Sequence, residues 1–112
     1  MNCCNCNITI NAGGQPYIAN TQVTVGAESV NIALGWRRIQ PIGYFTVRME
    51  NPIPSDATTT LPVTLTLNGI TRELLLPNGT PVTVAELLAT NVFLVFNDKY
   101  NGILALMSRT TA

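Results

Sequence analysis

The feature that most constrains this fold is an alternation of apolar and polar residues with a period of two. It runs through residues 7–11, 21–25, 30–37 and 44–50. Successive side chains of a β-strand point to opposite faces, so this period is typical of strands with one buried face. Glycine and proline residues separate the runs, as expected for turns. The chain is therefore predicted to be mostly β.

The pair Asn68-Gly69 lies between two apolar runs and predicts a β-hairpin. A two-residue type I′ loop needs positive φ at both positions, which Asn and Gly adopt readily. With this pair as the loop, the predicted cross-strand pairs are Leu67 with Ile70, Leu65 with Arg72, Val63 with Leu74, Leu61 with Leu76, Thr66 with Thr71 and Thr64 with Glu73. Arg72 is the one misfit on the apolar face, and we expect it to extend past the sheet edge near the turn.

The last third of the chain predicts a helix and a second hairpin. Thr83 followed by Glu86 indicates a capping box that opens a short helix over Val84 to about Ala89. The runs 92–96 and 103–107 are apolar on both faces, which is typical of strands covered on both faces. One cover is expected from the same domain and the other from a neighbouring subunit. The predicted interface residues are Val92, Phe93, Leu94, Val95, Phe96, Ile103, Leu104 and Leu106.

Length and composition predict one small globular domain. The chain has 112 residues, of which 46% are hydrophobic and 11% are charged, and this combination excludes intrinsic disorder. So few charges leave part of the surface for another chain to cover, which favours an oligomer. We expect a Cys-rich tail over 1–6 and a single β domain over 7–112. Short strands with turns between them predict an antiparallel β-sandwich or jelly-roll-like barrel, with one short helix near the C-terminus.

Charge and residue content exclude several functions. Six basic and six acidic residues cancel, and Arg37-Arg38 is the one basic doublet, so no nucleic-acid partner is expected. No apolar run reaches the roughly 18 residues of a membrane helix, and the first residues do not read as a signal peptide. The chain has no histidine, the commonest general base and neutral metal ligand. We therefore predict a non-enzymatic protein without cofactor, made in a cytosol without a signal peptide.

Three features leave alternatives open. Cys3, Cys4 and Cys6 cannot complete a tetrahedral zinc site in one chain; they either pool between subunits, anchor the tail to a larger structure, or have no role. Glu50 and Asp56 share a loop and could form a glycosidase-like pair, but they are expected to be solvated charges. Trp36 continues the alternation of Val30 to Leu34, which favours the core over stacking on a sugar or a partner protein.

The long irregular stretch over 50–60 is predicted to be an exposed loop, because its prolines block strand pairing and its threonines bury little. Loops carry recognition more often than strands do. The predicted recognition residues are Asn51, Pro52, Ile53, Pro54, Ser55, Asp56 and, in the last hairpin loop, Tyr100.

A family resemblance rests on the stretch from Leu61 to Arg109. Its parts are the Asn68-Gly69 hairpin, the run Arg-Glu-Leu-Leu-Leu-Pro-Asn-Gly-Thr-Pro over 72–81, the run Val-Ala-Glu-Leu over 84–87, and the apolar hairpin that turns at Gly102. This stretch resembles a segment of small phage virion proteins, including head-fibre, tail-fibre and auxiliary capsid proteins. The start Met-Asn-Cys-Cys-Asn-Cys and the Thr/Asn-rich, histidine-free composition are similar to proteins of crAss-like phages.

The resemblance implies a β-rich virion module, frequently placed around a symmetry axis. A receptor-binding fibre usually has a long shaft, and none is present, so we expect an auxiliary (decoration or cement) protein that docks on a phage capsid and stabilises it or carries head fibres. The implied partners are the major capsid protein, head fibres and further copies of the chain. The alternative is an adhesin that binds host glycans or a receptor through loops 50–60 and 98–102, with Tyr44, Tyr100 and Trp36 as stacking residues. A third possibility is a cellular β-sandwich of no viral origin.

Overall fold

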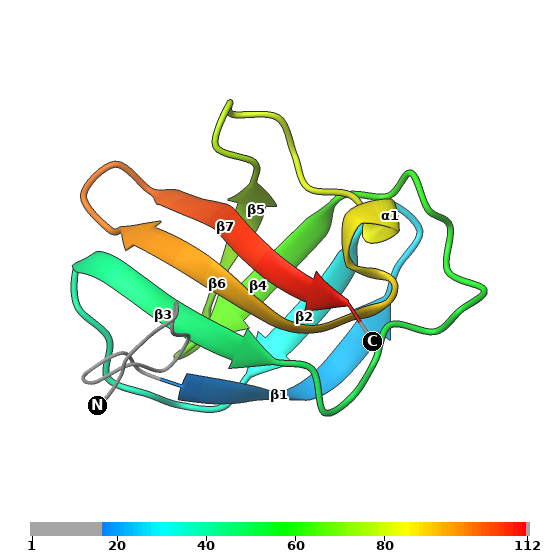
Figure 1. Cartoon of the computed structure of the whole chain (residues 1–112), viewed down its shortest axis with the longest axis horizontal. Helices are drawn as coiled ribbons and strands as arrows, with labels where there is room; N and C mark the ends of the chain where they lie inside the picture. Colours follow the sequence, from blue (N-terminus) through cyan, green and yellow to red (C-terminus); the bar gives the residue numbers. More distant parts are fainter. Residues whose placement is uncertain (1–16, 112) are drawn as a thin grey trace.

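The computed structural model describes residues 17–111, and its strands form one closed barrel (Figure 1). The elements are β1 (Tyr17–Val25), β2 (Val30–Leu34), β3 (Ile42–Arg48), β4 (Val63–Leu67), β5 (Ile70–Leu75), α1 (Val84–Leu87), β6 (Thr90–Asp98) and β7 (Ile103–Thr111). Around the barrel they follow the order β1-β2-β4-β5-β7-β6-β3. The prediction of a mostly β chain is confirmed, and the strands close into a barrel; neither a β-sandwich nor a jelly-roll topology is confirmed. The predicted strand 7–11 and tail 1–6 lie outside the described residues.

The strand directions differ from the antiparallel arrangement predicted. The pairs β1–β3, β2–β4 and β5–β7 are parallel, and the other four neighbouring pairs are antiparallel. Turn residues indicate only hairpins between consecutive strands, whereas these parallel pairs join strands that are distant along the chain. The sequence pattern therefore predicts most of the strands, but it does not predict that they close into a barrel.

The Asn68-Gly69 hairpin forms as predicted near its turn. Both residues have positive φ, 53° and 84°. Leu67 pairs with Ile70 and Leu65 with Arg72, and the hydroxyls of Thr66 and Thr71 lie 2.7 Å apart. The two outermost predicted pairs, Val63 with Leu74 and Leu61 with Leu76, are wrong. Val82 lies between the strands there: the Val63 amide donates to its carbonyl, and its own amide donates to the Leu74 carbonyl, both at 2.9 Å.

The helix α1 begins at Val84, as the capping box predicts, but it is shorter than the predicted helix over Val84 to about Ala89. It ends at Leu87, and two nine-residue strands follow it, so the expected position near the C-terminus is wrong. The capping residues are those predicted: the backbone amide and hydroxyl of Thr83 donate to the Glu86 carboxylate at 3.0 and 3.1 Å. No helix in the described part of the chain is long and apolar enough to span a membrane.

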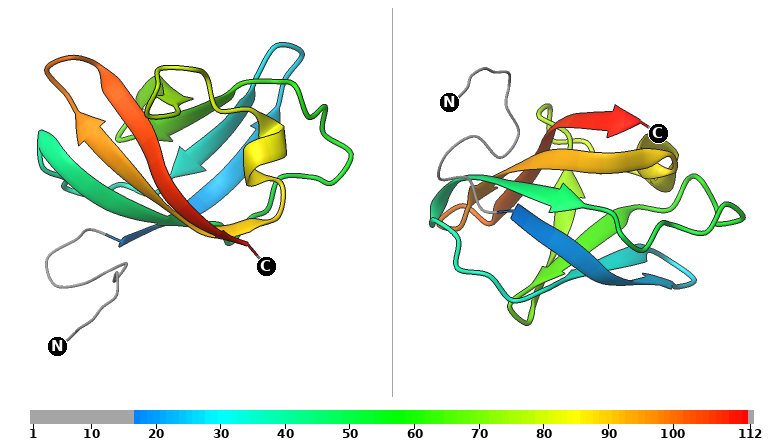
Figure 2. Two further views of the ribbon diagram at one scale, coloured as in Figure 1. Left: turned by 45° about the horizontal axis from the view of Figure 1, so that its top comes forward. Right: turned by 60° about the horizontal axis from the view of Figure 1, so that its bottom comes forward.

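One end of the barrel is covered by α1 and the long loop between β3 and β4. Val84 and Leu87 of the helix are buried, and so are Ile53 and Ala57 of the loop. Figures 1 and 2 show both segments at the same end, opposite the β6–β7 turn. We call this end the closed end. The other end is surrounded by residues 35–41 and by the β4–β5 and β6–β7 turns, and we call it the open end because no helix or long loop of residues 17–111 covers it.

The interior of the barrel corrects half of the predicted interface. Phe93 and Val95 are 0% exposed, Leu104 is 2% and Leu106 is 3% exposed in the single chain. These four side chains are core residues, and no second subunit is needed to cover them. The closed barrel provides the cover that was expected from the same domain, and the error was to list these inward-facing residues as part of an interface. The alternate residues Val92, Leu94, Phe96 and Ile103 are at most partly buried, on the outer face.

Candidate functional site

The outer surface of β1, β3, β6 and β7 carries a concentration of exposed apolar side chains, which we call the outer apolar face. Its exposed members are Tyr17, Ile42, Tyr44, Ile103 and Met107, and its partly buried members are Val92, Leu94 and Phe96. Tyr44 pairs across the sheet with Phe96, and their ring centroids lie 5.3 Å apart with the planes tilted by 59°. Polar residues flank the face: Arg48 approaches Glu50 at 3.9 Å, and hydrogen bonding to the Tyr17 hydroxyl raises the pKa of Arg48.

The opposite outer surface, on β2, β4 and β5, is polar and internally bonded. Asn31 Nδ2 donates to the hydroxyls of Thr64 and Thr66, both at 2.9 Å. The Thr66 hydroxyl continues the chain of bonds to Thr71. We call this surface the polar face. Because hydroxyl and amide groups are solvated at little cost, the polar face is suited to water, whereas the outer apolar face exposes large hydrophobic side chains.

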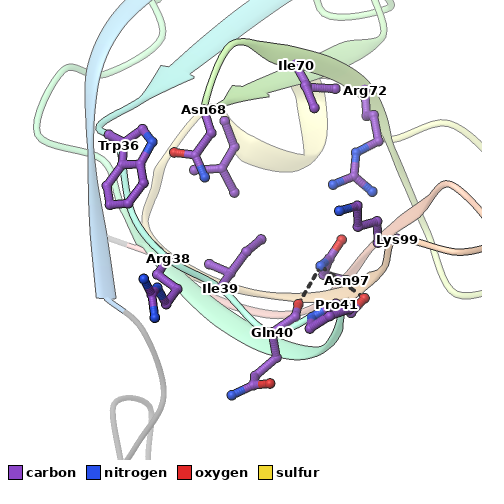
Figure 3. A pocket seen from close by; sticks show the side chains of 11 residues that line it. Trp36, Arg38, Ile39, Gln40, Pro41, Asn68, Ile70, Arg72, Asn97 and Lys99 are labelled. Carbon is purple, nitrogen blue, oxygen red and sulfur yellow. Dashed lines mark hydrogen bonds between the residues drawn. The ribbon is translucent and has the colours of Figure 1, made fainter.

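A pocket of about 470 Å³ opens at the open end of the barrel (Figure 3). Its volume lies within the roughly 300–1,000 Å³ typical of small-ligand sites. The apolar part of its wall is formed by Ile39, Pro41, Leu67 and Ile70. The polar part contains the cationic residues Arg38, Arg72 and Lys99 together with Asn97. Among the described residues that line the pocket, none is acidic.

Hydrogen bonds hold the rim of this pocket in place. The Arg37 amide donates to Asn68 Oδ1 at 3.0 Å, and Asn68 Nδ2 donates back to the Arg37 carbonyl at 2.8 Å. The Lys99 amide donates to the Pro41 carbonyl at 2.8 Å. These bonds fix the segment 35–41 against both neighbouring turns, so the rim is built before any ligand arrives.

Asn97 is the most unusual residue of the pocket. It ends the inward-facing row of β6 and is 2% exposed. Its Nδ2 donates to the Gln40 carbonyl at 2.8 Å and to the Pro41 carbonyl at 3.3 Å, which fixes the orientation of the amide. Its Oδ1 is buried and accepts no hydrogen bond from the described residues. Figure 3 shows this oxygen directed away from Gln40 and toward the hollow of the pocket.

Two cations are directed into the same hollow. Figure 3 shows the guanidinium of Arg72 and the ammonium of Lys99 pointing inward, and Arg38 lying at the rim. Arg72 pairs with Leu65 on the inner face and forms part of the pocket wall. The prediction that its side chain extends past the sheet edge is therefore wrong. Within residues 17–111 the one ion pair joins Arg48 and Glu50, so none of these three cations is paired with a described carboxylate.

The prediction that Trp36 packs in the core is wrong. Its side chain is 76% exposed and lies at the rim of the pocket. Val30, Ile32 and Leu34 are buried as the alternation predicts, but β2 ends at Leu34 and the chain then leaves the barrel wall. The period therefore extended two residues beyond the strand that produced it.

The predicted recognition residues are not brought together. The loop residues Asn51–Asp56 lie at the closed end, whereas Tyr100 is in the β6–β7 turn at the other end. Ile53 is 4% exposed and belongs to the core, so its place in a recognition loop is wrong. Pro52, Pro54, Ser55 and Asp56 are exposed as predicted. Tyr44 lies on the outer apolar face, apart from Trp36, so the three proposed stacking residues do not line one pocket.

Two further sequence features give no site in the described residues. Cys3, Cys4 and Cys6 lie outside them. Within residues 17–111, no group of three His, Cys, Asp or Glu side chains is arranged to hold a metal ion. Glu50 is near Arg48, and Asp56 is exposed on the loop.

The sequence analysis did not name Asn97, included Lys99 only as part of loop 98–102, and identified Arg72 only as a misfit on the apolar face. The sequence did contain a signal for Asn97. The alternation that places Phe93 and Val95 on one face of β6 places Asn97 on that same face, so a polar side chain on the inner side of the strand could have been predicted. Comparison of the chain with protein-family models, curated proteins and solved structures finds no match. The function is therefore argued from the geometry of this small β-barrel.

Proposed function

We propose that this chain is a non-enzymatic structural protein of a phage virion, an auxiliary protein that docks on the capsid shell through its outer apolar face. The observation that carries the proposal is the distribution of exposed hydrophobic side chains. Among residues 17–111, nine large hydrophobic side chains are exposed, and five of them belong to this face: Tyr17, Ile42, Tyr44, Ile103 and Met107. Contiguous exposed apolar patches mark interaction surfaces in soluble proteins.

The dimensions of the face limit how it docks. Four strands about 4.8 Å apart and about seven residues long at about 3.4 Å each cover about 460 Å². A specific interface buries about 800 Å² on each partner. The face is therefore large enough to be the apolar centre of an interface, but it needs a polar rim. Arg48 and Tyr100 border it, and Asp98 lies between Ile42 and Ile103 at the end of the face next to the β6–β7 turn. These residues supply hydrogen-bonding groups of the kind found at interface rims.

Repetition on a lattice would strengthen a modest contact. A capsid shell presents the same docking surface many times. If neighbouring copies of this chain are linked to one another, the binding of one copy raises the effective concentration of the next, and the overall affinity exceeds that of a single contact. The resemblance of residues 61–109 to small virion proteins supports a capsid as the partner, in preference to a soluble protein.

The test is the copy number of the chain on purified particles, measured by mass spectrometry. Tyr44→Lys places a charge at the centre of the outer apolar face, where a buried aromatic contact is commonly worth 2 kcal/mol or more, about thirtyfold in affinity. We expect hundreds of copies of the unaltered chain per particle and a loss of most of them for Tyr44→Lys. Thr71→Lys makes the same kind of change on the polar face and should leave the copy number unchanged.

Each contrary result has a definite meaning, provided that both variants unfold at the same urea concentration as the unaltered chain. Equal loss for Tyr44→Lys and Thr71→Lys would contradict docking through the apolar face. Absence from particles would contradict the virion role. If the chain is absent from particles and sedimentation shows dimers that Tyr44→Lys dissociates, the face pairs two copies and the capsid proposal fails.

A second candidate function, an adhesin that binds carbohydrate, is favoured by a separate observation. The pocket at the open end combines cations, an unbonded buried acceptor and a rim tryptophan. It shares no residue with the outer apolar face, so the two functions are compatible in one protein that is docked by its side and binds at its end.

A further inference from the structure

We propose that the pocket at the open end binds a glycan whose terminal sugar carries a carboxylate. In this site Arg72 and Lys99 hold the carboxylate, Asn97 Oδ1 accepts a sugar hydroxyl, and Trp36 stacks on the next sugar outside the pocket. The inference does not depend on docking through the outer apolar face. It keeps Trp36 as a stacking residue and Lys99 from loop 98–102, and it adds Arg72 and Asn97 in place of loop 50–60.

The charge of the wall selects an anion. The chain has six basic and six acidic residues, and three of the basic ones line this pocket with no acidic residue among the lining. Arg72 is half-buried and directed inward, where water screens its charge less than at the surface. A carboxylate between Arg72 and Lys99 would form charge-assisted hydrogen bonds, which are about twice as strong as neutral ones.

Asn97 selects a ligand that also donates hydrogen bonds. A buried acceptor without a partner costs about 1–3 kcal/mol, so native proteins leave few of them. The two bonds of Nδ2 to the carbonyls of Gln40 and Pro41 prevent the amide from turning its oxygen elsewhere. Oδ1 therefore faces the hollow as a fixed acceptor, and an anion without an O–H group, such as chloride or sulfate, has no donor to offer it. A hydroxylated anion satisfies both the cations and this oxygen.

Trp36 selects a ligand that extends out of the pocket. Its ring is at the rim and 76% exposed, so a small molecule seated between Arg72 and Asn97 would not cover it. The apolar face of a second sugar can lie on the ring while the first sugar fills the pocket. The hydrogen bonds that tie the Arg37 backbone to Asn68 hold this part of the rim in place, which lowers the entropic cost of binding.

Overall charge distinguishes a glycan from a single-stranded nucleic acid, which also offers anions and stacking groups. A nucleic acid carries a charge on every unit and is bound along an extended positive groove. This chain has zero formal net charge and concentrates its unpaired cations at one pocket. One terminal carboxylate can be bound by the cations of this single pocket.

The experiment is a titration of the full chain followed by the fluorescence of Trp36, which is the sole tryptophan. The probes are sialyllactose and a disaccharide that ends in glucuronic acid, with lactose as the neutral control and oligothymidine as the nucleic-acid control. We expect a saturable change with one of the acidic sugars and binding of lactose weaker by about tenfold or more. Lys99→Gln and Arg72→Gln should each weaken acidic-sugar binding about tenfold. Arg109→Gln removes the same charge from an exposed position on β7 and should have no effect.

Lys99 is an exposed turn residue, so its variant will fold even if a change at Arg72 or Asn97 disturbs the barrel. Equal binding of lactose and the acidic sugars, or equal weakening by Lys99→Gln and Arg109→Gln, would overturn the anion site. A response to oligothymidine that depends on Lys99, without a response to either sugar, would replace the glycan with a nucleic acid. No response to any probe would also overturn the proposal.

Discussion

The two ends of the barrel are built differently, although the same strands lead into both. At the closed end, Leu87 and Ile53 fill the opening with apolar side chains. The loop that covers this end is held by buried Asn20, whose Nδ2 donates to the Asn51 carbonyl at 2.7 Å and whose Oδ1 accepts from the Asn51 amide at 2.9 Å. At the open end, buried Asn97 uses its donor group, but its acceptor is unbonded within the described chain.

This difference shows that the open end is not imposed by the small size of the chain. A helix of four residues and one loop are enough to close the other end. The same number of residues at the open end could have brought apolar side chains over Leu67 and Ile39. Instead, that end retains inward cations and an unbonded amide oxygen, which cost stability unless a ligand uses them. Function is therefore expected where the barrel is less well satisfied.

The largest effect is expected at the closed end, where removing apolar volume should destabilise the whole barrel. Leu87→Ala empties a site that is 1% exposed and should lower the free energy of unfolding by about 2–5 kcal/mol, measured by urea denaturation. Leu88→Ala changes the neighbouring, only partly buried residue and should cost clearly less. Equal losses at the two positions would mean that α1 does not seal the barrel.

A smaller effect should separate the two buried asparagines. Asn20→Ala removes two side-chain hydrogen bonds of a fully bonded amide and should cost about 2 kcal/mol in unfolding free energy. Asn97→Ala also removes bonds, but it deletes a desolvated, unbonded oxygen at the same time, so it should cost about 1 kcal/mol. If Asn97→Ala lowers the free energy of unfolding more than Asn20→Ala does, the Asn97 oxygen is hydrogen-bonded in solution. The two ends would then not differ in how well their buried asparagines are bonded.

Local signals made the start of α1 and the turn of the β4–β5 hairpin predictable. The β4–β5 register near its turn followed from two residues that tolerate positive φ, and the start of α1 followed from Thr83 and Glu86. These interactions join residues that are close in sequence, so a single chain displays them. The inward alternation of Val30, Ile32 and Leu34 was equally visible.

Contacts between distant segments could not be predicted in this way. No turn residues predict the parallel pairs β2–β4 and β5–β7, because neither pair is joined by a short turn. Closure of the barrel through these pairs buries Phe93 and Leu104 within a single chain. The pocket depends on the same closure, because it brings Trp36, Arg72 and Asn97 from three separate segments to one end. Arg72 was recognisable as a misfit, but its neighbours were not.

The smallest change in stability, and the sharpest comparison of the two ends, is expected from Arg72→Leu. Arg72 is half-buried on an inner face that otherwise carries Leu65 and Leu74, and no described carboxylate pairs with it. Leucine would extend that apolar face and remove a partly desolvated charge, so the free energy of unfolding should stay the same or rise by up to about 1 kcal/mol in urea denaturation without ligand. Within residues 17–111 the closed end has no comparable position, because the buried side chains there are apolar or, like Asn20, hydrogen-bonded. A loss of more than about 1 kcal/mol would make Arg72 a structural residue, and the open end would then be held together by its polar groups as firmly as the closed end is by its apolar ones.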